Sequence, residues 1–522
     1  MDPREPPVIR PQIPVFGHMI GIAVHRVSYF TRLRSRTRLP AVTLPMFNTK
    51  LYVIFSPPLV QSALRARSMD SQEFTTPYIP ALFGISKRSH RRLLGEDGFH
   101  ESVAPPFHHI FRSTLSGEPL IELTRAVMDS VADALNEIGK EGVEVPNLYL
   151  WVREKVTCAT AAGLYGKKHN PYKDAAVIDA QWDFEEGLFP LSTGLLPSIL
   201  ARKAYLARVK VREALEPYYR GLHDQDPEAS EMVRTRTRLL REFELPIDEL
   251  ARLEVSVMLA ASSNTAPTVF WCLALVWQRP DILEDLRAEV SRVIDVQSID
   301  SGKVATMHFG RLESECPLLV ACYREALRIS SQVIMFRKVR SDTVISDGMG
   351  GSYLLRAGNI VMLPAKEVHR DETIWTTTGA AFVGVQITTH GGDGENEKIT
   401  KSTHVDGRAD LGPTYFVPRR FVPGEGDFTP DKEGARRRRT ALVPFGGGRH
   451  LCPGRHLAFN EVAAFLAAAV AGFEIDGLDG EKLRLQQARM ASVTKPEPGF
   501  EGGTVVLRRR KGWEEVTWRF EP

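Results

Sequence analysis

The most informative segment of the chain is Phe445-Gly446-Gly447-Gly448-Arg449-His450-Leu451-Cys452-Pro453-Gly454-Arg455, and an apolar helical pattern follows it from Leu457 to Phe473. A thiolate that binds a metal needs a tight loop whose backbone approaches closely, and glycine permits that approach. A helix beginning just after the cysteine directs its positive end toward the sulfur, which favours thiolate over thiol. The stretch therefore predicts a metal-ligating cysteine. The alternative is a glycine-rich turn around an inert buried cysteine.

The composition is that of a globular chain. Of its 522 residues, 43% are hydrophobic and 25% are charged, and the formal net charge of +3 is too small to indicate a nucleic-acid partner. The five cysteines are scattered, so they predict neither a disulfide framework nor a CxxC metal site, and a reducing compartment fits them best. No window holds the roughly 18 uninterrupted apolar residues of a spanning helix, so we expect the chain as written not to cross a membrane.

The remaining pattern predicts a mainly α protein with a minor β region. Apolar residues recur at helical spacing in three segments, and shorter β-type runs stand between turn residues in two others. The longest predicted helix is opened by Pro246 and Asp248 and stopped by Pro280. The predicted helices cover 121–138, 204–219 and 248–278, and the predicted strands cover 50–55 and 359–363.

Two further segments stand apart from this core. Residues 1–20 are proline-rich, which predicts an extended lead-in to the core, and residues 376–413 are rich in glycine, threonine and charge, which predicts a surface insertion or flexible loop. We find no internal repeat. The expected organisation is one domain over residues 1–522.

The cysteine stretch resembles the haem-binding signature of the cytochrome P450 superfamily, F-x-x-G-x-basic-x-C-x-G. Phe445, Gly448, His450, Cys452 and Gly454 match it in order, although His450 stands where arginine is commoner. The resemblance implies the cytochrome P450 fold, with haem b between the long oxygen-side helix and the cysteine loop, and Cys452 as the axial ligand of the iron. It also implies that Phe445 packs near the sulfur and that His450 faces a haem propionate.

Companion motifs lie upstream. Glu325 and Arg328 have the E-x-x-R spacing of the family, and the segment Phe416–Phe421 resembles its F-x-P-x-R-F motif, which makes Arg420 the third member of a buried network that retains haem. The alternative is an ordinary surface ion pair. By the same resemblance, Arg337 is directed at a propionate. Arg112 has the spacing of a propionate pair in which His108 replaces the usual tryptophan.

Within the long predicted helix, Ala261-Ser262-Ser263-Asn264-Thr265-Ala266-Pro267-Thr268 stands where the family carries A/G-G-x-D/E-T-T. The resemblance makes Thr265 the alcohol that guides protons and puts Asn264 in place of the usual acid. An amide cannot take up and release protons as a carboxylate does. Pro267 removes the hydrogen bond to the Ser263 carbonyl, so we expect a kink there. The alternative is a polar patch on a kinked core helix.

Asn264-Thr265-x-Pro267 followed by Phe270-Trp271 resembles the branch with sterol 7α- and 12α-hydroxylases and prostacyclin synthase. The expected activity is oxygen-dependent monooxygenation of a lipophilic small molecule, sterol-like, terpenoid or another secondary metabolite. NADPH-cytochrome P450 reductase or a similar donor would supply the electrons, because the chain has no evident flavin or dinucleotide motif. The alternatives are a haem-thiolate isomerase or dehydratase needing no external electrons, and a haem-binding sensor.

Two surfaces suit partners. The apolar stretch 188–200 precedes Arg202, Lys203, Arg208 and Lys210, a combination that fits peripheral membrane contact or, alternatively, a lid over a substrate pocket. The expected location is the cytoplasmic side of the endoplasmic reticulum membrane, with the cytoplasm as the alternative. Residues 436–439 are four arginines that could attract an acidic electron-transfer protein or be merely solvated.

Overall fold

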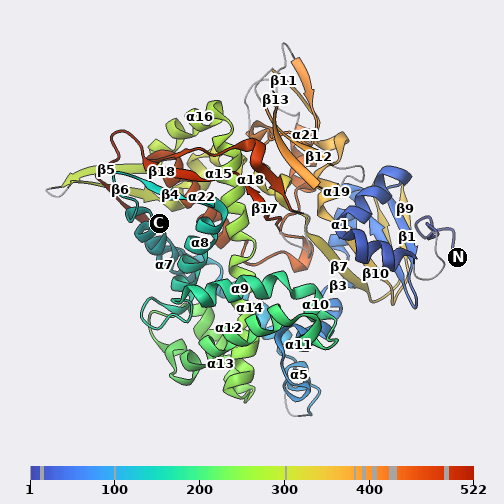
Figure 1. Ribbon diagram of the computed structural model, residues 1–522. Coiled ribbons are helices and arrows are strands. Elements are labelled where there is room, and N and C mark those ends of the chain that lie inside the picture. The colour runs from blue at the N-terminus through green and yellow to red at the C-terminus, as the bar shows by residue number, and fades with distance from the viewer. Residues whose placement is uncertain are drawn as a thin grey trace. The chain divides into compact units, whose positions relative to one another are not determined.

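A computed structural model (Figure 1) describes residues 2–11, 17–98, 101–299, 302–380, 384–390, 396–402, 408–422, 432–486 and 493–522. The chain forms two compact units. The first unit consists of Met1–Pro77, Arg324–Cys452 and Asp479–Glu501, and the second of Tyr78–Tyr323, Pro453–Leu478 and Gly502–Pro522. Helices predominate over strands, which confirms the predicted mainly α fold with a minor β region.

A five-stranded sheet organises the first unit. Both predicted strands occur, as β2 (Lys50–Ile54) and β10 (Ile360–Pro364), and they pair in parallel with Tyr52 opposite Val361. Both are almost continuously apolar because both faces of this central pair are covered. The strand order is β1-β2-β10-β7-β3, in which the other strands are β1 (Ala41–Pro45), β7 (Ile334–Val339) and β3 (Met69–Asp70).

The proline-rich start extends this sheet at its edge. Val8 forms a parallel bridge with Thr43 of β1, and the amides of Ile9 and Thr43 donate to the Thr43 and Pro7 carbonyls at 3.0 and 2.8 Å. These contacts give residues 7–9 an extended conformation, whereas residues 17–20 of the predicted lead-in are helical. Residues 12–16 lie outside the described part, and α1 (Gly17–Thr37) follows them.

Residues 376–413 were predicted to be a surface insertion or a flexible loop, and the flexible-loop alternative does not hold for their described part. This part forms the strands β11 (Thr377–Ala380), β12 (Gly384–His390), β13 (Asn396–Ser402) and β14 (Arg408–Leu411). β13 pairs with β16 (Leu483–Leu485), which continues to β17 (Pro496–Glu501). Backbone pairing with a strand eighty residues later supplies the order that composition did not indicate.

Packed helices build the second unit. The predicted amphipathic helices appear as α7 (Gly117–Asn136) and α12 (Arg202–Arg220), and the helix after the cysteine as α22 (Arg455–Gly472). Figure 1 shows α12 beside α9 (Ala175–Glu186) and α14 (Ile247–Ser262), and it contacts both. α22 is buried on nearly every face and packs against α7 and α15 (Thr265–Trp277). An all-round apolar pattern is typical of a helix in the centre of a core.

The long helix predicted over 248–278 is two helices. α14 (Ile247–Ser262) ends, two residues form a turn, and α15 (Thr265–Trp277) begins. The expected kink is confirmed, and it falls at Ser263 and Asn264 because Pro267 has no N–H for the Ser263 carbonyl four residues earlier. Together α14 and α15 are long and apolar enough to cross a membrane, but 72% of the most apolar window is buried inside the protein. Such burial is typical of a core helix.

Candidate functional site

The cysteine loop in the first unit is closed by its own backbone. The amide of Cys452 donates to the Phe445 carbonyl at 3.0 Å, and the amide of Leu451 donates to the Gly448 carbonyl at 3.3 Å. Gly448 has φ +64°, and a Cβ atom there would collide with the carbonyl oxygen of Leu64 at the end of α2 (Pro57–Arg65). The loop therefore needs glycine at 448 for both its conformation and its approach to α2.

Glu325, Arg328 and Arg420 form a fully buried ion-pair network in the first unit. Arg328 Nε and Nη2 donate to the two oxygens of the Glu325 carboxylate at 2.7 and 2.8 Å, and Arg420 Nη1 donates to Glu325 Oε1 at 2.9 Å. The Val417 amide adds a hydrogen bond at 2.9 Å. Nη1 and Nη2 of both arginines also donate to the carbonyls of His369, Leu411, Gly412, Pro413 and Tyr415, whereas Arg420 Nε has no hydrogen-bond partner among the described residues.

The charges in this network oppose the cost of burial. Burial by itself raises the pKa of Glu325, but Arg328 and Arg420 together hold that pKa below its ordinary value. Burial lowers the pKa of Arg420 to about 9, although the Glu325 carboxylate favours its charged form. The sequence prediction that these three residues meet is confirmed as geometry, and the surface-pair alternative is wrong because all three side chains are buried.

His369 links this network to the cysteine loop, and sequence reasoning missed it. Its carbonyl accepts from Arg328 at 2.9 Å, while its Nε2 accepts from the backbone amide of Val443, two residues before Phe445, at 3.0 Å. Burial, then the charge of Arg328, lowers the pKa of His369 to about 3, so the ring is neutral and can accept. Trp375, also missed, lies under the Arg328 guanidinium at 5.2 Å. Nothing in their local sequence marks either residue.

Arg337 is buried in the same unit without an ion-pair partner among the described residues. Its Nη1 donates to the neighbouring Phe336 carbonyl at 2.8 Å, and burial lowers its pKa to about 10. The nearby carboxylate of Asp70 is engaged by Arg340 at 2.9 Å and by Arg449. The guanidinium of Arg337 thus has spare N–H donors in a dry environment, which suits an anion.

His450 lies close to this charged group. Its Nε2 accepts from Arg449 Nε at 3.1 Å and lies 4.0 Å from Asp70 Oδ1. Asp70 was not predicted, because the contact joins positions nearly four hundred residues apart and the segment around Asp70 reads only as a helix start. The sequence signal for His450 was its place in the motif alone.

In the second unit, the helix break presents a series of hydroxyl groups. Thr265 Oγ1 donates to the Ala261 carbonyl at 2.9 Å, and Thr268 Oγ1 donates to the Asn264 carbonyl at 2.7 Å. The buried Ser262 hydroxyl donates to the Met258 carbonyl at 2.7 Å. Each hydroxyl gives its proton to the backbone one turn earlier, so its oxygen can still accept a hydrogen bond.

The remaining predicted residues belong to other elements. Arg112 is exposed on α6 (Ala104–Thr114), with His108 partly exposed one turn earlier, so its propionate role stays a prediction. Gly454 is the N-cap of α22. In the four-arginine run on α21 (Lys432–Ala441), three side chains are exposed, whereas Arg438 is buried and donates to the Ile374 and Thr376 carbonyls at 3.1 and 3.3 Å.

The chain is similar to proteins of a known family along most of its length. The sequence model described as Cytochrome P450 matches residues 6–378 and 412–501, and it leaves unmatched almost the same segment that composition set apart as an insertion. A Cytochrome P450 monooxygenase of Gibberella zeae is 30% identical over 100% of this chain and 92% of its own length. The cytochrome P450 monooxygenase nodJ of Hypoxylon pulicicidum is 28% identical over 100% and 93%.

More distant similarities agree. The human 7-alpha-hydroxycholest-4-en-3-one 12-alpha-hydroxylase is 22% identical over 91% of this chain and 87% of its own. Retinoic acid bound cyanobacterial CYP120A1 has the same fold, with a TM-score of 0.66 and 19% identity over 97% of this chain and 99% of its own. With a family match along most of its length and a relative 30% identical throughout, the chain belongs to the cytochrome P450 family of haem-thiolate monooxygenases.

Proposed function

We propose that Cys452 is the thiolate ligand of haem b and that Arg337 and His450 receive its propionates. The buried Arg337 supports this fit, because a propionate would supply the anion that its spare N–H donors lack. Phe445 and Gly448 fix the loop that presents the sulfur, and Gly454 starts the helix behind it. When bound, the haem supplies the centre at which molecular oxygen is activated.

The Cys452 assignment has a direct test. Cys452→Ala should abolish the red-shifted absorption of the reduced, carbon monoxide-bound protein, because that signal requires a thiolate ligand. Cys158→Ala is the matched control: its thiol is also partly exposed, burial raises its pKa, and the variant should keep the signal. A normal signal in Cys452→Ala would refute the assignment.

We propose that the enzyme inserts oxygen into a lipophilic small molecule of sterol-like or terpenoid character. The break between α14 and α15 carries this proposal, because it leaves the Ser263 carbonyl without its helical donor beside the Thr265 hydroxyl. A water held there could pass protons through Thr265, whereas Asn264 can orient the water but not exchange protons. The sterol 12α-hydroxylase among the similar proteins supports the substrate class.

NADPH-cytochrome P450 reductase or a similar protein would supply the electrons. The exposed Arg436, Arg437 and Arg439 offer positive charge to an acidic partner, and Glu433 neutralises part of it at 3.8 and 3.4 Å from the first two. The buried Arg438 does not contribute. The partner surface is thus three arginines rather than four.

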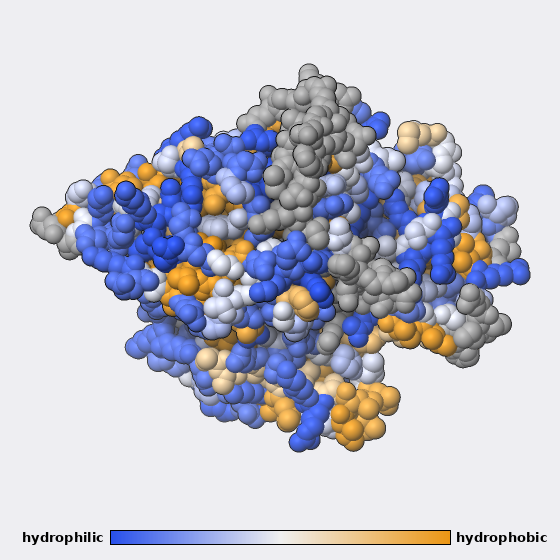
Figure 2. Space-filling model, turned by 45° about the horizontal axis from the view of Figure 1, so that its top comes forward, coloured by the Kyte–Doolittle hydropathy of each residue, from blue (hydrophilic) through white to orange (hydrophobic). Residues whose placement is uncertain are grey.

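We also propose peripheral contact with the cytoplasmic face of the endoplasmic reticulum membrane, with the cytoplasm as the alternative. Figure 2 shows apolar side chains gathered at the lower edge of the face that it presents. The segment from α10 (Leu188–Ser192) to α11 (Pro197–Leu200) exposes Phe189, Leu195, Leu196, Ile199 and Leu200. Exposed apolar side chains in such a cluster suit the headgroup boundary.

The basic flank of this segment is weaker than the sequence indicated. Arg208 is buried and donates to the Ala81 and Leu82 carbonyls at 2.7 and 2.9 Å, and Lys203 pairs with Asp183 at 2.7 Å. Only part of the predicted positive charge is therefore available to lipid.

We propose that all 522 residues form one catalytic domain. Each compact unit is assembled from three separate stretches of chain, so neither is a continuous piece that could be detached. Residues 376–413 would then be an insertion into this domain, in agreement with the gap in the family match.

The monooxygenase proposal is tested with a substrate identified by ligand-induced spectral shifts across sterols and terpenoids. Product formation should require reductase and NADPH. Thr265→Ala should lower product per NADPH consumed and release peroxide, while substrate binding is kept. Thr268→Ala removes the same hydroxyl-to-carbonyl bond one turn along the helix and serves as the control. Full turnover without an electron source would instead establish the isomerase.

A further inference from the structure

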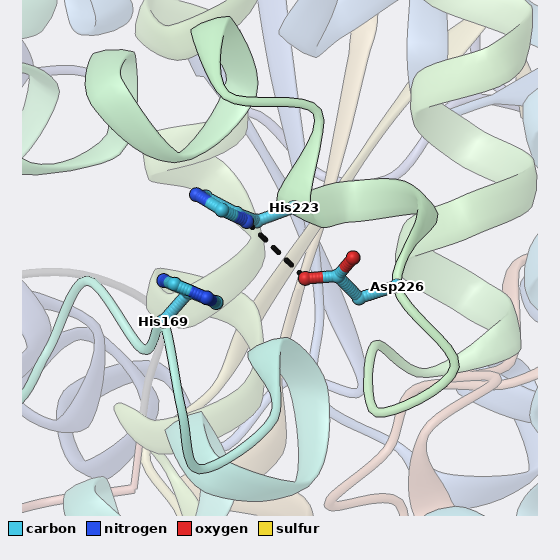
Figure 3. A group of neighbouring side chains, drawn as sticks. All are labelled: His169, His223 and Asp226. Carbon is cyan, nitrogen blue, oxygen red and sulfur yellow. Dashed lines mark hydrogen bonds and ion pairs between the residues drawn. The ribbon is translucent and has the colours of Figure 1, made fainter.

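Three side chains of the second unit have the composition of a metal site. They are His169, in the turn after α8 (Leu148–Tyr165), and His223 and Asp226, at the 3-10 helix η2 (His223–Gln225). His223 Nδ1 lies 3.2 Å from Asp226 Oδ2, and the two imidazole rings stack with centroids 3.6 Å apart and planes 8° apart. One potential ligand atom of each residue lies within 4.8 Å of the other two. Figure 3 shows the three side chains facing one another from two separate segments.

Other contacts hold these two segments together. Glu228 Oε2 accepts from the backbone amides of Lys167 and Lys168 at 3.1 and 3.2 Å, and the Ser230 amide donates to the Leu164 carbonyl at 2.9 Å. These bonds join the chain just before His169 to the chain just after Asp226. The three side chains are therefore brought together by hydrogen bonds that none of them makes, as in a preorganised site.

The 3-10 helix is also fixed from its buried side. Asp224 follows His223 in the chain and is buried. It accepts hydrogen bonds from Thr237 Oγ1 at 2.9 Å and from Arg241 Nη2 at 2.8 Å. A Cβ atom at Gly221 would lie 2.7 Å from His223 Nε2, so this nitrogen packs against the chain. His223 Nδ1 is left as the nitrogen that faces Asp226 and His169.

The stack of the two histidines is poorly explained by ring packing alone. Face-to-face stacking is the least favourable arrangement of two aromatic rings, and two protonated imidazoles at this distance would repel each other. Asp226 provides one carboxylate for both. A cation bound by one nitrogen of each ring and by the carboxylate would replace this stack, because the lone pair of a ring nitrogen lies in the plane of its ring.

We propose that His169, His223 and Asp226 bind a divalent transition-metal ion, with Zn²⁺ as the probe ion. Two imidazole nitrogens and one carboxylate suit zinc, and water would complete a tetrahedron. Ligands about 2.1 Å from zinc lie roughly 3.4 Å apart. The His223–Asp226 pair, at 3.2 Å, already has nearly that separation, and the exposed His169 ring would turn out of the stack so that one of its nitrogens faces the same ion.

The bound ion would join two parts of the unit. His169 precedes α9, and His223 follows the C-terminal end of α12, which packs against both α9 and α14. A metal bridge between them stabilises this helical layer in the folded protein only, so it should raise the melting temperature. The inference does not rest on the proposed monooxygenase reaction.

The test is calorimetric titration of the haem-loaded full chain with Zn²⁺ at pH 7.5 after chelator treatment. One ion should bind, and His169→Ala, His223→Ala and Asp226→Asn should each weaken it by about tenfold or more. His308→Ala is the matched control, since its Nε2 pairs with Asp295 at 3.0 Å but it belongs to no described three-ligand group. It should bind as the native protein does, and Mg²⁺ should not compete.

Unchanged zinc affinity in His169→Ala and His223→Ala would overturn the proposal, as would weakening in His308→Ala of the same size. A second measurement needs no variant: crystals of the native protein soaked in Zn²⁺ should show an anomalous peak at the zinc edge between the three side chains. Absence of that peak with zinc bound elsewhere would also overturn it.

Discussion

At the scale of single residues, the Glu325 network shows how a short motif can be structural. The Glu325 carboxylate accepts hydrogen bonds from four N–H groups. The two arginines also donate to backbone carbonyls of the segment 411–415. The link from Arg328 through His369 to Val443 extends this rigidity to the chain that enters the cysteine loop. We propose that the network orients the loop and takes no part in the reaction itself.

Removing one member should leave a buried charge without its partner. Arg420→Ala and Glu325→Ala should each destabilise the protein by roughly 3 to 5 kcal/mol and give little haem-loaded protein. Arg324→Ala, on the same helix but only partly buried and outside the network, should load normally. Haem content per protein and thermal unfolding measure the effect, and normal loading of Arg420→Ala would contradict it.

Glu461 gives a second prediction at this scale, from a different unit. It is buried in α22, burial raises its pKa to about 8 against a smaller opposing effect of Thr160, and its Oε1 has no partner among the described residues. In the unfolded chain the group ionises near pH 4.5. At a pH between these two pKa values, Glu461 is ionised in the unfolded state but still protonated in the folded state. The free energy of unfolding therefore falls as pH rises from about 4.5 to about 8.

Glu461→Gln removes this ionisation. The stability of the variant relative to the native protein should increase over that pH window by up to about 4 kcal/mol and stay constant above it. Melting temperatures of both proteins at several pH values from 5 to 9 measure the change. If the melting temperatures of the variant and the native protein changed in parallel with pH, the pKa of Glu461 would not be raised by folding.

At the scale of elements, the cysteine loop is defined as much by α2 as by its own sequence. Gly448→Ala should largely prevent haem incorporation, because its Cβ would meet the backbone carbonyl of Leu64 in a conformation unfavourable for alanine. Gly447→Ala is a strict control: its backbone is extended, and its Cβ would lie 2.8 Å from the movable Cδ1 of Leu64. It should load haem nearly normally.

The two glycine variants are compared by haem content and by the carbon monoxide spectrum. Equal loss of haem in both variants would mean that the loop tolerates no side chain at either position, rather than that Gly448 is specifically required.

The break between α14 and α15 depends on one residue. Pro267 decides where α14 ends and thereby where Thr265 and Asn264 lie.

At the scale of the whole molecule, both units depend on segments distant in sequence. The second unit needs α22 from the C-terminal part, where it packs against α7 and α15. The fragment Tyr78–Tyr323 expressed alone should therefore not unfold cooperatively, because α15 would expose the apolar face that α22 covers. Circular dichroism during heating tests this, and a sharp transition would contradict it.

Much of this protein could be read from its sequence. The apolar periodicities predicted a mainly α fold and the glycine-cysteine stretch predicted the loop, because these signals are local: a helical face and a turn. Pro267 predicted the helix break for the same reason. The members of the ion-pair network followed from the resemblance of the E-x-x-R and F-x-P-x-R-F segments to the motifs of the family. Composition also set apart the insertion, although it failed to predict the strands within it.

Tertiary structure decided what depends on long-range contacts. His369 and Asp70 reach the cysteine segment only through folding, and β13 becomes ordered by pairing with β16. Arg208 is buried, and so is Arg438, although Arg437 and Arg439 beside it are exposed. The meeting of His169 with His223 and Asp226 has the same origin. Local sequence fixes conformational preference, whereas proximity between distant residues follows from the cooperative burial of the whole core, which no single segment specifies.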